Sequence, residues 1–145
     1  NGAAVYISRL GSTVSKAQVE FANDNGVVGS IKTSGSATSY NTSSDYRLKT
    51  DAQPMAGASA RVQALNPVNF EWISDGSRVD GFLAHEAQAV VPEAVSGTKD
   101  AVDADGNPEY QGIDQGKLVP LLTAALQEAL TKIEAMEARL TALES

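Results

Sequence analysis

The feature that most constrains this chain is an apolar repeat near its C-terminal end. Apolar residues recur there at alternating steps of three and four: Val119, Leu122, Leu126, Ala129, Ile133, Met136, Leu140 and Leu143. This spacing fills every a and d position of a heptad repeat, which places all eight side chains on one face of an α-helix. We therefore expect a long coiled-coil helix over residues 114–145, with these eight residues as its association seam.

Charged residues beside this seam favour self-association of parallel chains. Lys132 and Arg139 fall at g positions, and Glu137 and Glu144 fall at e positions five residues later. Parallel coiled coils place their interhelical charge pairs at this spacing. The alternative is an amphipathic helix that packs on its own domain.

Three further leucines lie off the seam and widen the apolar face: Leu118, Leu121 and Leu130. They are expected either to dock the start of the helix on a globular part or to favour more than two strands. Pro120 lacks an amide donor, so we expect the regular coil to begin after it.

The chain divides into two chemically different pieces near residue 43. Residues 1–43 carry three basic and two acidic side chains, a net charge of +1, which leaves 8 basic and 16 acidic ones, a net charge of −8, for residues 44–145. The first piece alternates short apolar runs, at 5–7 and 27–31, with the turn formers Asn25-Gly26 and Ser34-Gly35. This pattern predicts short strands and tight turns.

The first piece holds too few large apolar side chains to bury a sufficient core alone. We therefore interpret residues 1–43 as the end of a longer, β-rich protein. Residues 38–44 are polar and low in complexity, which predicts an exposed connection.

Residues 44–113 read as a small mixed domain. Apolar positions within 53–65 have helical spacing, and the predicted helix ends at Asn66-Pro67. Alternating residues at 68–72 and 79–83 flank a turn-forming segment and predict a hairpin with one apolar face. A short helix over 84–91 is stopped by Pro92, and 95–112 reads as loop or short strand with a turn at 105–107. The fold class is therefore α+β.

Metal and cofactor sites find little support in the residues. The chain has no cysteine and a single histidine, His85, and the position four residues after it is Ala89, so a zinc-protease helix is excluded. Aligning Gly106 with the glycine of a calcium loop puts Ala101 and Gly112 at ligand positions, which instead indicates a solvated β-turn. No glycine-rich phosphate loop is present, and we expect neither a metal nor a cofactor.

Membrane and nucleic-acid partners are also not expected. No run of roughly 18 apolar residues is present, and residues 1–10 lack a basic region followed by an apolar core. The 11 basic residues are scattered in an acidic chain, whereas phosphate contact needs clustered Lys and Arg.

Ser44 and Lys49 form the one candidate catalytic pair. A serine beside a neutral lysine is a nucleophile with a general base, provided that burial or a positive neighbour such as Arg47 favours the neutral amine. Residues five apart diverge by about 140° on a helix and lie on opposite faces of a strand. The pair therefore needs an irregular bend, or a lysine from a neighbouring chain. From spacing alone, the favoured interpretation is that Ser44 or Asp45 caps a following helix and Lys49 is a solvated charge.

Several segments resemble one family when they are taken together. They are Ser44-Asp45-Tyr46-Arg47-Leu48-Lys49, Leu65 to Trp72, Gly81 to Glu86, Val91-Pro92-Glu93, Lys117 to Leu122, and Gln127-Glu128. In this order and spacing, residues 44–145 resemble the intramolecular chaperone domain of phage tail spikes, tail fibres and endosialidases, the S74 peptidase family. His85 stands where the family often has glutamine, which does not affect the cleavage motif.

The resemblance implies a trimeric chaperone that assists folding of its own N-terminal fibre region and then removes itself. By position, cleavage falls at the Ser43–Ser44 bond, with Ser44 as nucleophile and Lys49 as base, and no turnover of external substrates is expected. The family context is a phage virion tail that attaches to a host receptor, assembled in the host cytoplasm. The runner-up is a non-cleaving trimerisation module at the end of a stalk, and a conventional hydrolase is a weak third.

Overall fold

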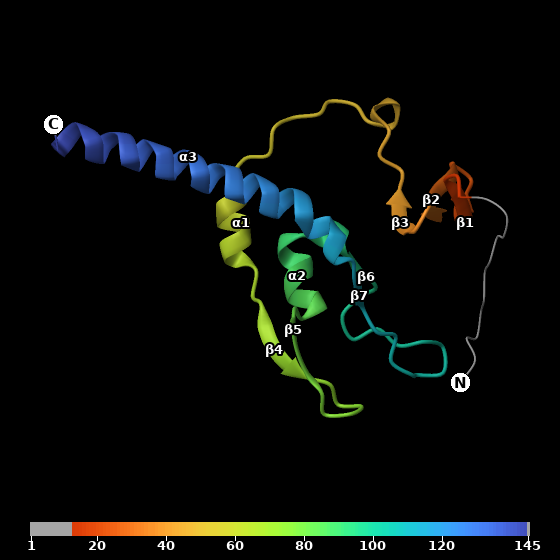
Figure 1. The fold of residues 1–145 in the computed structure, drawn as a ribbon. Coiled ribbons are helices and arrows are strands. Elements are labelled where there is room, and N and C mark those ends of the chain that lie inside the picture. Colours follow the sequence, from red (N-terminus) through yellow and green to blue (C-terminus); the bar gives the residue numbers. More distant parts are fainter. Residues whose placement is uncertain (1–12, 145) are drawn as a thin grey trace. The chain divides into compact units, whose positions relative to one another are not determined.

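The computed structural model describes residues 13–144, which form two compact units divided between Ala52 and Gln53 (Figure 1). Both sheets and helices are present, so the predicted α+β class is confirmed. The predicted division at residues 43 and 44 falls inside the first unit. The strand expected at 5–7 lies outside the described residues.

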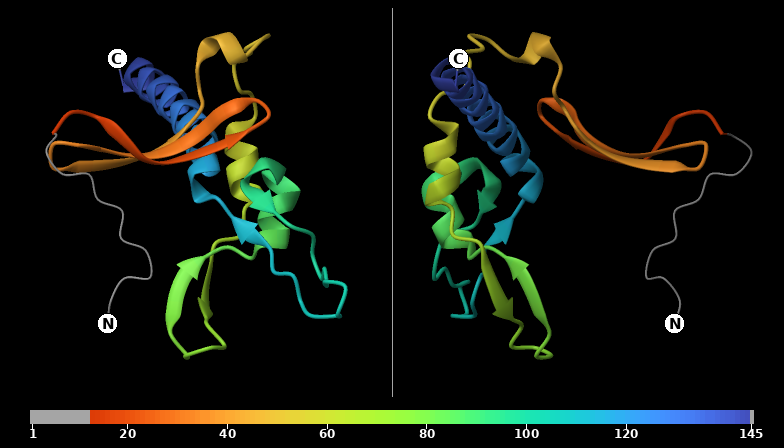
Figure 2. Two further views of the ribbon diagram at one scale, coloured as in Figure 1. Left: turned by 90° about the vertical axis from the view of Figure 1, so that its right-hand side faces the viewer. Right: turned by 60° about the vertical axis from the view of Figure 1, so that its left-hand side comes forward.

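The first unit contains an antiparallel sheet of three strands in sequence order. These are β1 (Lys16–Asn23), β2 (Gly26–Ser34) and β3 (Ala37–Thr42), and Figure 2 shows how they twist along their length. Both predicted turns join them, with Gly26 at φ 87° and Gly35 at φ 55°, the left-handed region in which glycine has no steric cost.

The exposed connection predicted over 38–44 is wrong for most of its length, because residues 38–42 belong to β3. All six side chains of β3 are exposed, and the strand is held by backbone pairing with β2 from Ala37 opposite Ser34 to Thr42 opposite Gly29. A polar sequence was thus compatible with a strand, since an edge strand needs a partner backbone and no buried side chain.

The sheet has almost no core of its own. Among its described residues only Ser30 is buried, while Phe21, Val27 and Tyr40 are each more than half exposed. This agrees with the expectation that the first piece cannot bury a sufficient core alone.

The second unit packs short helices against the start of a long one. Its elements are α1 (Ala58–Ala64), α2 (Ala84–Val90), β6 (Val95–Ser96), β7 (Gly112–Ile113), the 3-10 turns η2 (Pro92–Ala94) and η3 (Gln115–Leu118), and α3 (Val119–Glu144). The buried core draws on every helix of this unit: Ala58, Leu65, Ala87, Val91, Ala94, Leu118 and Leu121. The predicted short helix before Pro92 is confirmed as α2.

Helix α1 ends as predicted but starts five residues later than the interpretation of 53–65 as helical requires. Gly57, directly before it, has φ 67°, a left-handed conformation that interrupts the helix. At the other end, Leu65 is extended. Pro67 disfavours the helical conformation for Asn66, so the helix ends before this pair.

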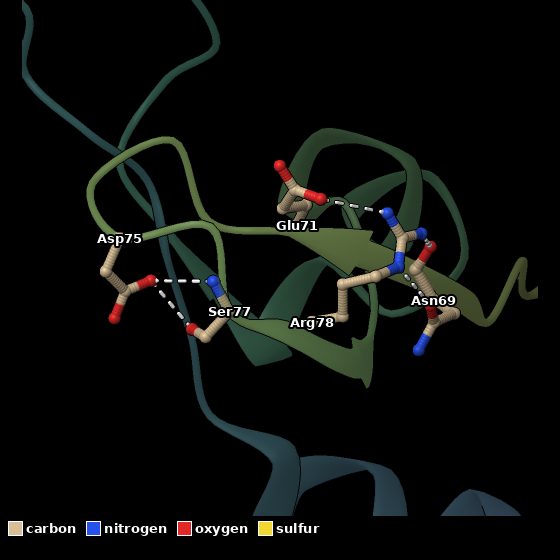
Figure 3. A network of polar contacts seen from close by, with 5 residues as sticks. All are labelled: Asn69, Glu71, Asp75, Ser77 and Arg78. Atoms are coloured by element: carbon tan, nitrogen blue, oxygen red, sulfur yellow. Dashed lines mark hydrogen bonds and ion pairs between the residues drawn. The ribbon is translucent and has the colours of Figure 1, made fainter.

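The predicted hairpin is confirmed as β4 (Val68–Glu71) paired antiparallel with β5 (Arg78–Gly81). Arg78 donates from Nε to Asn69 Oδ1 at 2.9 Å and from Nη1 to Glu71 Oε2 at 3.4 Å (Figure 3). In the connecting loop, Asp75 Oδ1 accepts hydrogen bonds from the N–H and hydroxyl of Ser77, at 2.9 and 2.8 Å. This cap lowers the pKa of Asp75.

Helix α3 presents two different apolar faces. Leu121 is 2% exposed and lies in the core with Leu118, while Ala124 and Ala125 pack at the edge of the core. These residues dock the start of α3, and Figure 1 shows α1 lying against this first half while the rest of α3 extends beyond it. Leu130 is half exposed, so the docking expected of the three off-seam leucines is confirmed for two of them.

The predicted seam lies on the other face and is open in this single chain. All eight seam residues are exposed, for example Leu126 at 61% and Met136 at 67%. The alternative in which this stripe packs on its own domain is therefore not what the fold uses. Assembly through the seam stays a prediction.

The described residues also bear on the metal-site and membrane-span expectations. Within residues 13–144, no three His, Cys, Asp or Glu side chains gather as metal ligands would, and no helix has the length and hydropathy to cross a bilayer. His85 is exposed on α2. At the 103–107 turn, Asp103 Oδ1 accepts the N–H groups of Asp105 and Asn107 at 2.9 and 2.8 Å, as a hydrogen-bonded surface turn does.

Candidate active site

The bond between Ser43 and Ser44 lies directly after β3. The Ser43 N–H donates to the carbonyl oxygen of Val28 at 3.0 Å, and its hydroxyl donates to the carbonyl oxygen of Val27 at 3.3 Å. Both acceptors belong to β2, so Ser43 is tethered to the sheet although β3 ends one residue earlier. The acyl side of the bond is thus held by the sheet.

A single 3-10 turn, η1 (Tyr46–Leu48), follows Ser44. Asp45 caps this turn, since its Oδ1 accepts the Arg47 N–H at 2.8 Å. The turn closes through two backbone hydrogen bonds, from Leu48 N–H to the Asp45 carbonyl at 3.1 Å and from Lys49 N–H to the Tyr46 carbonyl at 3.0 Å. The capping role expected of Ser44 or Asp45 is performed by Asp45, on a 3-10 turn and not on an α-helix.

The turn brings the two candidate residues together within one chain. Lys49 Nζ donates to Ser44 Oγ at 2.7 Å. Regular helix or strand geometry would keep residues five apart from meeting, so η1 supplies the irregular bend that the pairing requires. A lysine from a neighbouring chain is not needed for this contact.

The charges beside the pair are themselves paired. The Arg47 guanidinium donates to both oxygens of the Asp45 carboxylate, from Nε at 2.9 Å and from Nη2 at 2.8 Å. The side-chain hydrogen bond from Arg47, followed by its backbone N–H, lowers the pKa of Asp45, and the same contact raises the pKa of Arg47. The positive neighbour that the sequence places beside Lys49 is therefore largely neutralised by Asp45.

Solvent reaches every member of the site in the single chain. Residues 41–50 are all exposed, with Tyr46 at 81% and Leu48 at 72%. A lysine acts as a general base only when it is neutral, and loss of water around it favours that form. The geometry therefore places a serine hydroxyl, a lysine amine and the Ser43–Ser44 amide bond side by side, all accessible to water.

The fork between Asp45 and Arg47 is a feature that sequence reasoning missed. The sequence predicts Arg47 as a positive neighbour of Lys49 and Asp45 as a cap, whereas the structure pairs the two side chains with each other. The signal was available in their spacing, because a capping Asp commonly bonds the residue two positions on, and a carboxylate there meets an arginine as a bidentate partner.

Residues 44–96 match the family model Peptidase_S74, described as chaperone of endosialidase. The S74 resemblance is confirmed for these residues. The match begins at Ser44, whose hydroxyl contacts Lys49, and ends at Ser96, before α3 and its seam. The family description supports a chaperone role. No curated protein matches the chain.

Proposed function

We propose that this chain is the intramolecular chaperone of a phage tail fibre or spike, which trimerises, assists folding of its own N-terminal fibre region and then cleaves its Ser43–Ser44 bond. One observation carries the proposal: the first residue of the S74 match has its hydroxyl oxygen 2.7 Å from the amine of Lys49. A serine–lysine pair of this kind requires no histidine, metal or cofactor.

The proposed reaction is a single turnover on the chain's own backbone. Neutral Lys49 takes the proton of the Ser44 hydroxyl, and Oγ attacks the carbonyl carbon of Ser43. The new C–O bond forms as the Ser43–Ser44 C–N bond breaks, and the Ser44 nitrogen receives the proton and becomes a free amine. Because this nitrogen and Oγ belong to the same residue, the two parts of the chain stay joined by the ester. Water then hydrolyses the ester, which yields a Ser43 carboxylate and restores the Ser44 hydroxyl.

The exposed face of α3 supports the trimerising part of the proposal. An unpaired stripe of Leu, Ile, Val and Met along a helix is stabilised when several copies bury it together. Leu130, at an e position and half exposed, widens this stripe as more than two strands would require. The S74 resemblance favours three.

Trimerisation gives the chaperone role a physical basis. Interleaving chains into one β-structured fibre demands non-local pairing in a single register, which is slow and prone to misassembly. A coiled coil that holds three chain ends together raises their effective concentration before the strands pair. The proposed setting is the host cytoplasm during assembly, with the fibre part retained in the virion tail.

The variant Lys49→Arg distinguishes the self-cleaving chaperone from a non-cleaving stalk module. Arginine keeps the positive charge and the ability to donate to Ser44, but it stays protonated and cannot act as a base. We expect wild type to run on an SDS gel as fragments of 43 and 102 residues, and Lys49→Arg as one full-length band. Light scattering should show three copies per particle for both proteins: three full-length chains for Lys49→Arg, and three 102-residue fragments for wild type. A single stable band for wild type would favour the non-cleaving stalk module, and equal cleavage of both proteins would remove Lys49 from the mechanism.

A further inference from the structure

Local hydrogen bonds hold the bend that joins Ser44 to Lys49. The turn η1 spans three residues and buries none of them, and its two backbone hydrogen bonds are both at least 3.0 Å long. Short 3-10 turns without packing are weak, so additional contacts must decide how often Lys49 reaches the serine hydroxyl.

Three such contacts involve one carboxylate. Asp45 accepts the Arg47 N–H at 2.8 Å, and both of its oxygens accept from the Arg47 guanidinium, at 2.9 and 2.8 Å. The first bond fixes the start of the turn, and the fork fixes the orientation of the carboxylate that makes it.

We infer that Asp45 is a positioning residue for autocleavage, which closes the η1 turn and thereby holds Lys49 against Ser44, with Arg47 orienting its carboxylate. This inference rests on the proposed function and adds to it. Asp45 touches neither Ser44 Oγ nor Lys49 Nζ in these contacts, so its effect is on geometry. A displacement of about 1 Å between reacting groups can slow a reaction about a hundredfold, which makes a loosened turn costly.

The chain offers a matched control for this role. Asp75 caps the hairpin loop in the same way, accepting the N–H of the residue two positions on at 2.9 Å, and it is likewise exposed (Figure 3). Asp75→Ala removes an equivalent hydrogen-bonded turn remote in sequence from Ser44. A general cost of losing a surface cap would appear in both variants.

The test measures first-order cleavage rates of the full chain after purification under conditions that block cleavage, with the oligomer size checked by light scattering. We expect Asp45→Ala to slow cleavage at least about tenfold and Asp45→Asn, which keeps the capping oxygen, to stay within about threefold of wild type. Arg47→Lys keeps the cap and loses the fork, as Asp45→Asn does, so it should likewise stay within about threefold of wild type. Asp75→Ala should match wild type.

The outcomes separate this inference from the function on which it rests. If wild type cleaves and Asp45→Ala cleaves equally fast, the positioning role is wrong and the Ser44–Lys49 pair is untouched. If Asp45→Asn is as slow as Asp45→Ala, the amide fails to rescue the turn and the positioning role is again wrong. If wild type does not cleave at all, the proposed function fails, and the positioning role fails with it.

Discussion

Glu128 on α3 accepts two hydrogen bonds from Ser59 at the start of α1, one from its backbone N–H at 2.9 Å and one from its hydroxyl at 2.5 Å. A third, from the Ala58 N–H at 2.8 Å, completes a cap for a helix that has no side-chain cap of its own. The carboxylate at a helix N-terminus is stabilised by these donors and by the helix dipole. The Ser59 hydroxyl, then the two backbone donors, lower the pKa of Glu128 to about 2.

This contact predicts a pH-dependent stability difference between wild type and Glu128→Gln. Because the folded pKa lies below the ordinary value of 4.5, the stabilisation is fully present above that value and is lost as pH falls toward about 2. Urea unfolding should show wild type to be more stable at pH 7, with the difference between the two proteins shrinking between about pH 4.5 and pH 2. A difference that stays constant across this range would contradict the cap.

The docking of α3 is tested by two neighbouring leucines. Leu121 is 2% exposed in the core, so Leu121→Ala should lower the free energy of unfolding by about 3 kcal/mol. Leu122 is 48% exposed in the single chain, so Leu122→Ala should act only through assembly. In urea unfolding, the effect of Leu122→Ala should therefore depend on protein concentration. Equal, concentration-independent losses for both variants would argue against the separation of the two faces.

A polar substitution in the middle of the seam tests whether the seam holds the trimer together. Ile133 lies at an a position and is half exposed in the single chain. Ile133→Asn should weaken the trimer strongly, since three polar side chains would meet in its apolar interior. Sedimentation at micromolar concentration should show a shift toward monomer, whereas Glu134→Ala, one residue off the seam, should leave the trimer intact. An unchanged trimer in Ile133→Asn would show that chains associate elsewhere.

Much of the local structure was predictable because proline and glycine mark the element ends. The hairpin 68–81, the helix before Pro92, the turns at Gly26 and Gly35 and the long α3 all follow from short-range patterns. The start of α1 was not predictable from short-range patterns. The apolar spacing of 53–65 favours an earlier start, whereas Gly57 interrupts the helix. The carboxylate that caps α1 belongs to Glu128, about seventy positions away in the sequence. The spacing of Ser44 and Lys49 shows that a contact between them needs an irregular bend. It does not predict where the bend lies, because a single 3-10 turn leaves no periodic signal in the sequence.

A charge-swap experiment tests whether the α3 helices associate in parallel. Changing Lys132 and Arg139 to Glu should weaken the trimer by severalfold in dissociation constant, because each would then face Glu137 or Glu144 of another chain. Changing those two glutamates to Lys in the same protein should restore assembly at low salt. Failure of the second pair of changes to rescue the first would exclude parallel g-to-e pairing.

The central claim, that Ser44 cuts the bond in front of it, is tested most directly by intact-mass measurement of wild type and Ser44→Ala after the same incubation, with Ser43→Ala as the matched control. The account predicts fragments 1–43 and 44–145 from wild type and from Ser43→Ala, and only the full-length chain from Ser44→Ala. Efficient cleavage of Ser44→Ala at this bond, or loss of cleavage in Ser43→Ala alone, would contradict it.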